Sequence, residues 1–327
     1  KPCRSPGKLV YHLVWHGCCI KLVHGNRQEE VWLVTVQEPA PTQRRHPKTP
    51  AHGKGWKARL QMQLECAITG QGAKTVMTGL HHYGPLRVQR PFYPEGGTAH
   101  IYLLHPPGGV VGGDGLEIDI TAGTQAHGLF TTPGATKFYL SAGDSARVSQ
   151  ALTVAPGGTL EWFPQENIFF PGAKVHMDTT IDLHGDARFM GWEISCLGRP
   201  VNSEIFEQGN IDARFRINRD GRPLLIERLK VDQPRHLNAS SGLRNFPMQA
   251  LFVATGCNEV LLEQAREIIA GNTGEMPCGL TLIDDILVMR VLGTRCEKIQ
   301  ALMIPVWQLL RQALLNKPAA IPRIWNT

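Results

Sequence analysis

Single acidic residues among aromatic residues, glycine and proline are the first candidates for chemistry in this sequence. The clearest cases are Glu161 and Glu166, in the aromatic segment at residues 161–173. A carboxylate in such a setting can contact a metal ion transiently. It can equally be a structural group that is partly buried and hydrogen-bonded. The residues alone leave both alternatives open.

Asp114 ends a glycine-rich run at residues 105–114. The run begins with His105 and contains four glycines, Gly108, Gly109, Gly112 and Gly113. A phosphate-binding loop needs Lys and Ser or Thr directly after its last glycine. Here an aspartate follows instead, and its charge would repel phosphate. The run is therefore expected to form either a tight turn between strands or a functional turn that presents Asp114 and His105.

A second polar motif, at residues 131–139, contains Thr132, Pro133, Gly134 and Lys137. Lys137 could serve as a catalytic amine only if it were desolvated beside a partner group. Nothing nearby in the sequence indicates such a partner. A loop that contacts other proteins is the favoured interpretation.

A third motif, at residues 191–200, includes Ser195, Cys196, Arg199 and Pro200. The adjacent serine and cysteine lack the flanking glycines of a nucleophile elbow. Cys196 is therefore expected to pack as a small apolar side chain. Arg199 and Pro200 are assigned to a structural or partner-binding loop.

Paired carboxylates leave one enzymatic alternative open. A glycoside hydrolase needs two carboxyl groups on opposite sides of the scissile bond. Glu161 and Glu166, or Asp178 and Asp182, are the candidate pairs. This alternative, a β-helical carboxylate-dependent glycoside hydrolase, predicts that one pair faces a common cleft.

The elements that must position these residues are mostly strands. Apolar and polar residues alternate at 116–120, 175–183 and 211–217, and a period of two is typical of half-buried strands. Turn signals lie between such segments at Pro156–Gly158, Pro171–Gly172 and Asp220–Gly221. No repeat of fixed length is apparent.

Helical periodicity appears only near the C-terminus. One apolar stripe contains Leu261, Ala265 and Ile269, and Gly271 is placed to end that helix. A second helix is expected from about residue 297 to 315. Pro305 should kink this helix or force it to start late. The fold class is therefore mainly β, with a small helical C-terminal part.

Composition narrows the function classes. The chain has 327 residues, 19% of them charged, and a net charge of +6. The basic residues form no stripe with interleaved aromatic residues, which disfavours nucleic acid as a partner.

No apolar run is long enough to span a membrane, and no export signal opens the chain. The eight cysteines match no zinc or disulfide framework. A protein of the reducing cytoplasm is expected.

Residues 1–52 differ from the rest of the chain. They contain several histidines and cysteines and end in a segment rich in proline and arginine, Pro39 to Pro50. Such a composition is typical of a linker or a disordered arm. The expected organisation is an atypical extension at 1–52, disordered or mis-assigned, followed by one domain at 53–327.

The motifs taken together resemble the UreD (UreH) family of urease accessory proteins. The resemblance extends from about Gly53 to Thr327. It is carried by residues 82–86, 88–94, 105–114, 131–139, 162–173, 196–200 and 322–325. Several ordered motifs at matching spacing are much more specific than any one of them.

The resemblance implies a β-helix-like, strand-dominated fold and no enzymatic activity. It implies binding to UreF, through UreF to the GTPase UreG, and to the urease apoprotein. The complex would promote nickel insertion into urease, and an internal tunnel would serve as the nickel route. Nickel would be in transit, with no cofactor tightly bound. Residues 1–52 have no counterpart in the shorter family members, and Pro305 departs from the family pattern.

By position in the motifs, Asp114, Glu166 and Glu204 match acidic residues that line the nickel route in the family. Oxygen ligands would hold nickel weakly enough to release it, whereas thiolates would retain it. The hypothesis is that these three carboxylates make transient contacts with nickel. His105, Thr132 and Lys137 would then shape the surrounding loops.

Overall fold

The computed structural model describes residues 14–16, 19–24, 27–30, 55–70 and 72–326. The chain divides into two compact units, residues 1–51 and 52–327. In the first unit, β1 (Val14–His16), β2 (Cys19–His24) and β3 (Arg27–Glu30) form an antiparallel sheet in the order β1-β2-β3. The arm expected at residues 39–50 lies outside the described residues.

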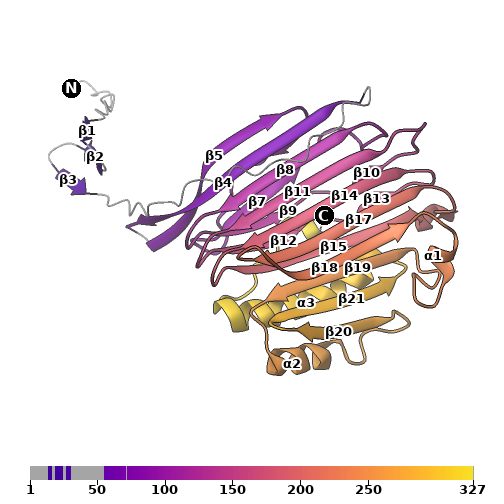
Figure 1. Cartoon of the computed structure of the whole chain (residues 1–327). Coiled ribbons are helices and arrows are strands. Elements are labelled where there is room, and N and C mark those ends of the chain that lie inside the picture. Colours follow the sequence, from indigo (N-terminus) through magenta and orange to yellow (C-terminus); the bar gives the residue numbers. More distant parts are fainter. Residues whose placement is uncertain (1–13, 17–18, 25–26, 31–54, 71, 327) are drawn as a thin grey trace, which may run out of the picture. The chain divides into compact units, whose positions relative to one another are not determined.

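The second unit is built on two large sheets (Figure 1). A seven-stranded sheet has the order β18-β17-β14-β11-β8-β4-β5. Its strands are β4 (Lys57–Thr69), β5 (Gly72–Tyr83), β8 (Gly115–Ala122), β11 (Ala146–Val154), β14 (Lys174–Leu183), β17 (Asn210–Arg219) and β18 (Arg222–Val231). It is called here the outer sheet.

An eleven-stranded sheet, the inner sheet, follows the path β20-β21-β19-β15-β12-β9-β7-β6, with β10, β13 and β16 attached beside it. Its strands are β6 (Arg87–Val88), β7 (Ala99–Leu104), β9 (His127–Thr131), β10 (Thr136–Phe138), β12 (Thr159–Phe163), β13 (Asn167–Phe169), β15 (Arg188–Arg199), β16 (Glu204–Ile205), β19 (Met248–Thr255), β20 (Cys278–Ile283) and β21 (Ile286–Gly293).

The chain winds as a β-solenoid, because it passes alternately from one sheet to the other. In the outer sheet, Leu116 of β8 pairs with Val148, Val148 with Met177, and Met177 with Ala213, always in parallel. The expectation of a β-helix-like fold is confirmed. The intervals between these paired residues are unequal, which explains why the sequence shows no repeat of fixed length.

Alternating side chains on the strands make the core between the two sheets. In β14, Val175, Met177, Thr179, Ile181 and Leu183 are buried, and the residues that alternate with them are only partly covered. The strands predicted at 116–120, 175–183 and 211–217 are all present as β8, β14 and β17.

Short turns close one edge of the solenoid, and their backbone groups are capped by aspartates of the next turn. Asp186 Oδ1 accepts a hydrogen bond from the Gly157 amide at 2.7 Å. Asp220 Oδ1 accepts one from the Gly185 amide at 3.1 Å. Gly157 has φ +70°, a left-handed conformation that favours glycine. The turn signals around Pro156 and Asp220 thus mark real turns.

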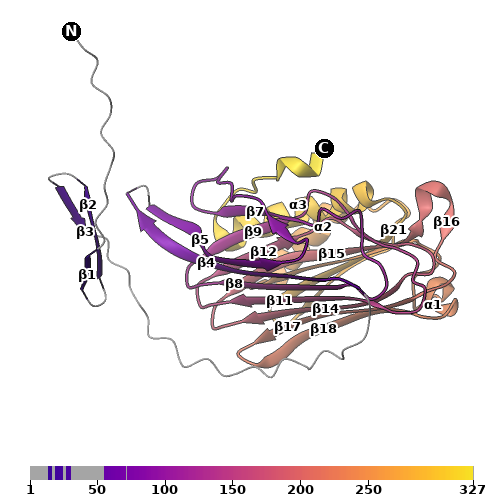
Figure 2. The ribbon, with the colours of Figure 1, turned by 90° about the horizontal axis from the view of Figure 1, so that it is seen from above.

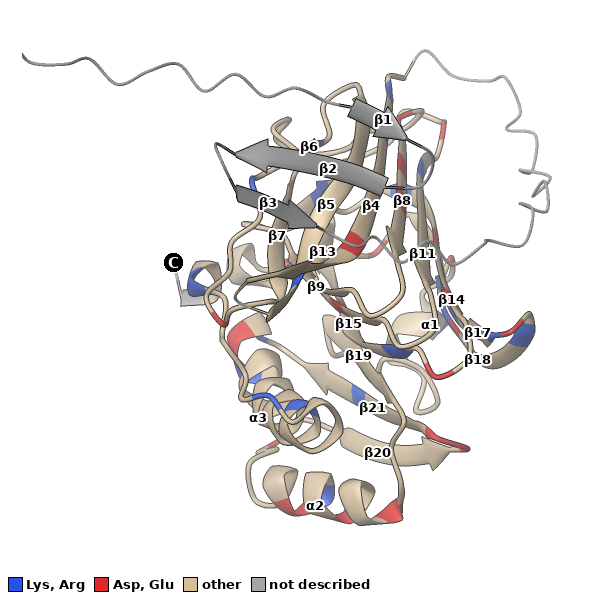
Figure 3. Cartoon of the chain, turned by 90° about the vertical axis from the view of Figure 1, so that its left-hand side faces the viewer, with Lys and Arg blue, Asp and Glu red and all other residues tan. Residues whose placement is uncertain are grey.

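Two helices cover the far face of the inner sheet, as Figure 3 shows from the side. α2 (Glu259–Ile269) begins at Asn258, whose Oδ1 accepts from the Leu261 amide at 3.0 Å. α3 (Cys296–Leu315) runs through Pro305 without a break, so the alternative of a late start is wrong.

The remaining helices are short: η1 (Pro200–Asn202), α1 (Arg235–Asn238) and η2 (Arg323–Asn326). The helix layer forms a second hydrophobic core with the inner sheet, in which Trp192, Met303 and Trp307 are buried. Within the described part of the chain, no helix combines the length and the apolar character needed to cross a membrane.

Candidate functional site

The long loops of the solenoid all lie on the edge opposite the short turns, near β16 in Figure 2. Each loop leaves the inner sheet and enters the outer sheet. The loops span residues 105–114, 132–145, 164–173 and 200–209, and together they are called here the loop edge. The loop edge contains every residue that the sequence assigned to the nickel route or to a partner-binding loop except Arg199, which is the last residue of β15.

Backbone hydrogen bonds join consecutive loops of this edge. The amide of Val110 donates to the Lys137 carbonyl at 2.8 Å, and the Thr136 amide donates to the Glu166 carbonyl at 2.9 Å. The Gly172 amide donates to the Gln208 carbonyl at 2.6 Å. Four motifs that are far apart in the sequence therefore form one continuous surface.

Side chains stack along the same edge. The Tyr139 hydroxyl donates to the Gly108 carbonyl at 2.9 Å, and the Tyr139 ring lies edge-on to Phe170 at 4.8 Å. The Arg199 guanidinium lies over the Phe170 ring at 4.8 Å. Gly109 makes this close packing possible, since a Cβ there would lie 2.4 Å from Cε2 of Tyr139.

The three predicted carboxylates lie on separate loops and have separate partners. Buried Asp114 accepts hydrogen bonds from the amides of Trp56 at 3.2 Å and Val111 at 3.0 Å. Glu204 forms an ion pair with Arg199, with Arg199 Nε 2.6 Å from Glu204 Oε2. Glu166 Oε2 lies 3.4 Å from the Cys296 Sγ.

None of these carboxylates belongs to a preformed metal centre. Across the described residues, no group of three or more His, Cys, Asp and Glu side chains is arranged to hold a metal ion. The transient contact of Asp114, Glu166 and Glu204 with nickel remains a prediction.

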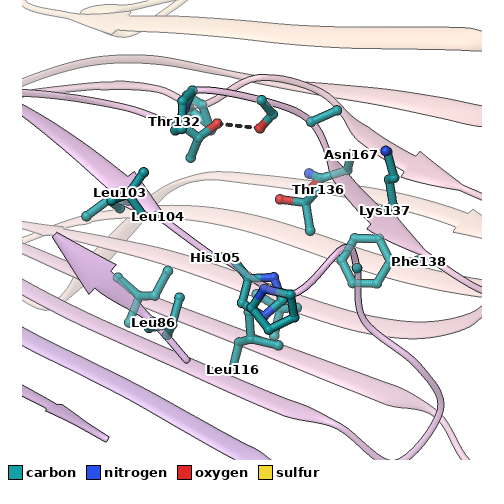
Figure 4. A pocket seen from close by; sticks show the side chains of 18 of the residues that line it. Leu86, Leu103, Leu104, His105, Leu116, Thr132, Thr136, Lys137, Phe138 and Asn167 are labelled. Carbon is teal, nitrogen blue, oxygen red and sulfur yellow. Dashed lines mark hydrogen bonds between the residues drawn. The ribbon is translucent and has the colours of Figure 1, made fainter. Parts of the chain in front are cut away.

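A cavity of about 360 Å³ opens at the loop edge and extends between the two sheets. Figure 4 shows part of its lining. Residues of the first two motifs lie at its mouth: His105, Gly108, Gly109, Thr132, Pro133, Gly134 and Lys137. Its inner wall is largely apolar but includes Gln150 and Glu193.

Glu193 is the polar residue that the sequence analysis missed. It lies in β15, on the face that points toward the outer sheet together with Phe189 and Leu197. The residue lies deep in the fold, yet it keeps some accessible surface because it borders the cavity. Burial raises the pKa of Glu193 to about 7. Since both faces of β15 are covered, its sequence lacks the alternation that would have placed Glu193.

Thr179 connects Glu193 to the outer sheet. Its Oγ1 lies 2.8 Å from Glu193 Oε1 and 3.0 Å from Gln150 Oε1. One hydroxyl hydrogen cannot serve both acceptors. A protonated Glu193 resolves this conflict, because it can donate to Thr179 while Thr179 donates to Gln150. The arrangement therefore agrees with the raised pKa of Glu193.

A second buried carboxylate, Glu161, lies between the inner sheet and α3. Its oxygens receive hydrogen bonds from His127 Nε2 at 2.7 Å, Trp307 Nε1 at 2.6 Å and Arg311 Nε at 3.0 Å. Burial alone raises the pKa of Glu161, but the His127 hydrogen bond and the Arg311 charge outweigh it and lower the pKa. Glu95 also binds Arg311, at 2.6 Å.

The hydrolase alternative finds no support in these positions. Glu161 has no accessible surface, and its oxygens are already bound, so no substrate can reach it. Asp178 and Asp182 are held on the exposed face of β14 by Arg216 and Asn218, at 2.5 and 2.9 Å. Neither pair faces a common cleft, as this alternative required.

Cys66, Cys196, Cys257, Cys278 and Cys296 are free thiols. Cys196 packs in the core between the inner sheet and the helices, as predicted. Burial raises the pKa of Cys196 and of Cys257 to about 12. A thiol with such a pKa is a poor nucleophile and a poor metal ligand.

Comparison with known proteins identifies the family. Residues 57–326 match the profile of the family described as UreD urease accessory protein. A urease accessory protein UreD from Alcanivorax borkumensis is 79% identical over 294 residues, which cover 90% of this chain and 100% of the relative.

More distant relatives carry the same name. The UreD from Aliivibrio fischeri MJ11 is 45% identical over 290 residues, covering 86% of this chain and 100% of the relative. The UreD from Escherichia coli is 45% identical over 279 residues, covering 84% of this chain and 98% of the relative. The chain belongs to the UreD family of urease accessory proteins.

Proposed function

We propose that this chain is a non-enzymatic scaffold that supports urease maturation in the cytoplasm. With UreF, and through UreF with UreG, it delivers nickel to the urease apoprotein. Nickel is the cargo and no cofactor is tightly bound. The role in urease maturation is supported by the family and by relatives named urease accessory protein. Neither a nucleic acid nor a membrane is a partner in this proposal.

The observation that carries the proposal is the carboxyl group of Glu193 in the cavity between the sheets. Its surroundings are mostly apolar, and Thr179 and Gln150 are its polar neighbours. Carboxylate, amide and hydroxyl oxygens bind borderline cations less tightly than thiolates do. Such a site can accept Ni²⁺ when the carboxyl loses its proton and can release the ion again.

The acidic residues of the loop edge extend this route in the proposal. Asp114, Glu166 and Glu204 lie on three of the loops that surround the cavity mouth or follow it along the edge. To bind a cation, Glu204 would have to break its ion pair with Arg199. Asp114 would have to give up a hydrogen bond from a backbone amide. Their contacts with nickel are therefore expected to be brief.

Nickel loading of urease tests the proposal directly. The chain is co-expressed with UreF, UreG and urease apoprotein, and nickel and bicarbonate are added. Glu193→Gln should lower the nickel bound per urease several-fold while the complex still assembles. The control is Glu117→Gln, which changes an exposed glutamate of β8.

Two results would overturn parts of the proposal. Full nickel loading by a variant that combines Glu193→Gln with Asp114→Asn, Glu166→Gln and Glu204→Gln would exclude these residues from the route. Failure of the unchanged chain to bind urease or to promote its activation would overturn the scaffold function itself.

A further inference from the structure

The last residues of the chain form a strap over the inner sheet. Residues 316–326 follow α3 and lie on the same side of this sheet as α3 (Figure 2). Both ends of the segment bind β9. Lys317 Nζ lies 3.2 Å from His127 Nδ1, and Trp325 Nε1 donates to Thr131 Oγ1 at 2.9 Å. His127 and Thr131 are the first and last residues of β9, so this segment, called here the C-terminal strap, spans the strand.

The C-terminal strap covers a cluster of aromatic side chains. The Trp325 ring lies 5.0 Å from Trp192, 5.6 Å from Trp307 and 5.9 Å from Phe163, measured between ring centroids. These three rings have no exposed surface, whereas Trp325 is only partly buried. Trp325 is therefore the outer layer of the cluster. Opening of the strap would uncover an apolar surface of the kind that proteins rarely leave exposed.

The contact of Lys317 fixes the protonation state of His127. An ammonium has only donors, so His127 Nδ1 must accept the hydrogen bond from Lys317. The other ring nitrogen, Nε2, lies 2.7 Å from the carboxylate of Glu161 and donates to it. The ring is therefore neutral and carries its proton on Nε2. Lys317 and a second proton compete for Nδ1.

A second proton on His127 removes the contact with Lys317. Protonated Nδ1 can no longer accept from the ammonium, but it can donate to Thr98 Oγ1, which lies 3.2 Å away. Thr98 is also the other partner of Lys317, at 3.0 Å. Two positive charges would then meet in partly buried surroundings, where repulsion is stronger than in water.

The other charged groups around His127 leave this competition intact. Nε2 donates to Glu161 in both protonation states, so the change is confined to Nδ1. The remaining groups are bound elsewhere: Arg311 of α3 pairs with Glu161 and Glu95, and His100 of β7 pairs with Glu95.

We propose that the C-terminal strap is a pH-sensitive cover of the aromatic cluster, latched by Lys317 while His127 is neutral and loosened when His127 takes up a second proton. Histidine side chains change charge between about pH 5 and 8, so the strap opens more often as the pH falls through this range. Arg311 still holds the Pro318 carbonyl, so the proton shifts an equilibrium and does not detach the strap. The inference goes beyond the proposed function and does not depend on it.

Hydroxyl-radical footprinting of the intact chain, read by mass spectrometry, measures the opening. The oxidation rate of Trp325, relative to that of Tyr83, should rise about threefold or more between pH 8 and pH 5. Tyr83 is a suitable reference because it is 70% exposed and belongs to β5. Met177, in the core between the sheets, should stay protected at both pH values, which excludes global unfolding.

Two variants test the latch. His127→Gln offers an acceptor to Lys317 and a donor to Glu161 but cannot take up a proton, so the strap should stay closed at both pH values. Lys317→Met removes the latch, so the strap should be as open at pH 8 as that of the unchanged chain at pH 5. The control is His184→Gln, which changes a histidine with a 45% exposed side chain and should keep the full pH response.

Several results would overturn the inference. One is an unchanged chain whose Trp325 is oxidised equally at pH 8 and pH 5. Another is a pH response that persists in His127→Gln. If His127→Gln does not fold, Lys317→Met decides: a pH response equal to that of the unchanged chain would exclude Lys317 as the latch. Nickel loading of urease tests the proposed function separately, so the two can fail independently.

Discussion

At the scale of single residues, Glu193 stands out because burial shifts its titration toward neutral pH. Its pKa rises from 4.5 to about 7. Below about pH 4.5 the carboxyl is neutral in both the folded and the unfolded chain. Between 4.5 and 7 only the folded chain holds the proton, so the free energy of unfolding falls as the pH rises. Above about pH 7 the carboxyl is ionised in both states, and the free energy of unfolding no longer falls.

Glu193→Gln is therefore expected to stabilise the protein at alkaline pH. Glutamine can keep the contact with Thr179 but cannot ionise, so the variant avoids the cost of a buried charge. At pH 8 the free energy of unfolding should exceed that of the unchanged chain by up to about 3 kcal/mol, less any screening by water in the cavity. At pH 4.5 the two should be equal. Urea denaturation at both pH values measures the difference.

The control for this prediction is Glu117→Gln on the exposed face of β8, which should change stability little at either pH. A Glu193→Gln variant that is no more stable at pH 8 than at pH 4.5, relative to the unchanged chain, would contradict the assignment of a buried neutral carboxyl.

At the scale of elements, α3 shows how packing overrides local preference. Pro305 has no amide hydrogen, so the Ala301 carbonyl receives no helical hydrogen bond from it. The sequence therefore predicted a kink at this proline or a late start of the helix. The helix starts at Cys296 and continues through the proline, because Leu302, Met303, Val306 and Trp307 on either side of it are all buried against the inner sheet.

Pro305→Ala should raise the free energy of unfolding by about 2 kcal/mol. The substitution restores a hydrogen bond and removes a steric clash, together worth about 3 kcal/mol, and it loses up to about 1 kcal/mol by freeing the unfolded chain. Thermal unfolding followed by circular dichroism measures the effect.

Pro318→Ala is the matched control for this change, because Pro318 lies beyond the end of α3. This change should lower the free energy of unfolding slightly or leave it unchanged, because its only effect is to give the unfolded chain more conformational freedom. A Pro305→Ala variant with the melting temperature of the unchanged chain would mean that α3 has already adapted to the proline.

At the scale of the whole molecule, the strands and turns were predictable but their arrangement was not. Alternation located β8, β14 and β17, and proline and glycine located the turns between them. The parallel pairing that gathers four motifs on one edge joins residues at unequal distances along the chain. Only the resemblance to a known family implied the β-helix-like fold.

The loop residues of the candidate site were predictable from the sequence, but its buried network was not. Its loop residues were found because glycine, proline and charged residues make distinctive motifs. The buried network of Glu161 was missed, because its partners come from distant segments: Arg311 and Glu161 are 150 residues apart. No local pattern indicates that a glutamate on a strand will meet an arginine on the last helix.

Arg311 connects the parts of the second unit. It binds Glu161 of β12 at 3.0 Å and Glu95, which precedes β7, at 2.6 Å. It also donates to the carbonyl of Pro318, in the segment that follows α3. One side chain with no exposed surface thus joins the inner sheet, a loop and the helix layer.

Arg311→Met should lower the free energy of unfolding at pH 7 by about 3–5 kcal/mol. The substitution keeps the side-chain volume but leaves Glu161 as a buried charge without its guanidinium partner. Glu161→Gln combined with Arg311→Met removes both charges and should recover part of the loss. Urea denaturation of the single and double variants measures both effects.

The pH dependence of the same variant distinguishes a lost charge pair from lost packing. The pKa of Glu95 is lowered from 4.5 to about 2, because hydrogen bonds from His100 and Arg311 outweigh the effect of burial. A lowered pKa stabilises the fold above about 4.5, and this contribution disappears as the pH falls toward 2. The pKa of Glu161 is also lowered.

Without Arg311 the stabilising contributions of Glu95 and Glu161 both shrink. The loss in free energy of unfolding caused by Arg311→Met should therefore be largest at neutral pH and smaller at pH 3. A deficit that is the same at both pH values would show that Arg311 stabilises the fold through packing and not through its charge.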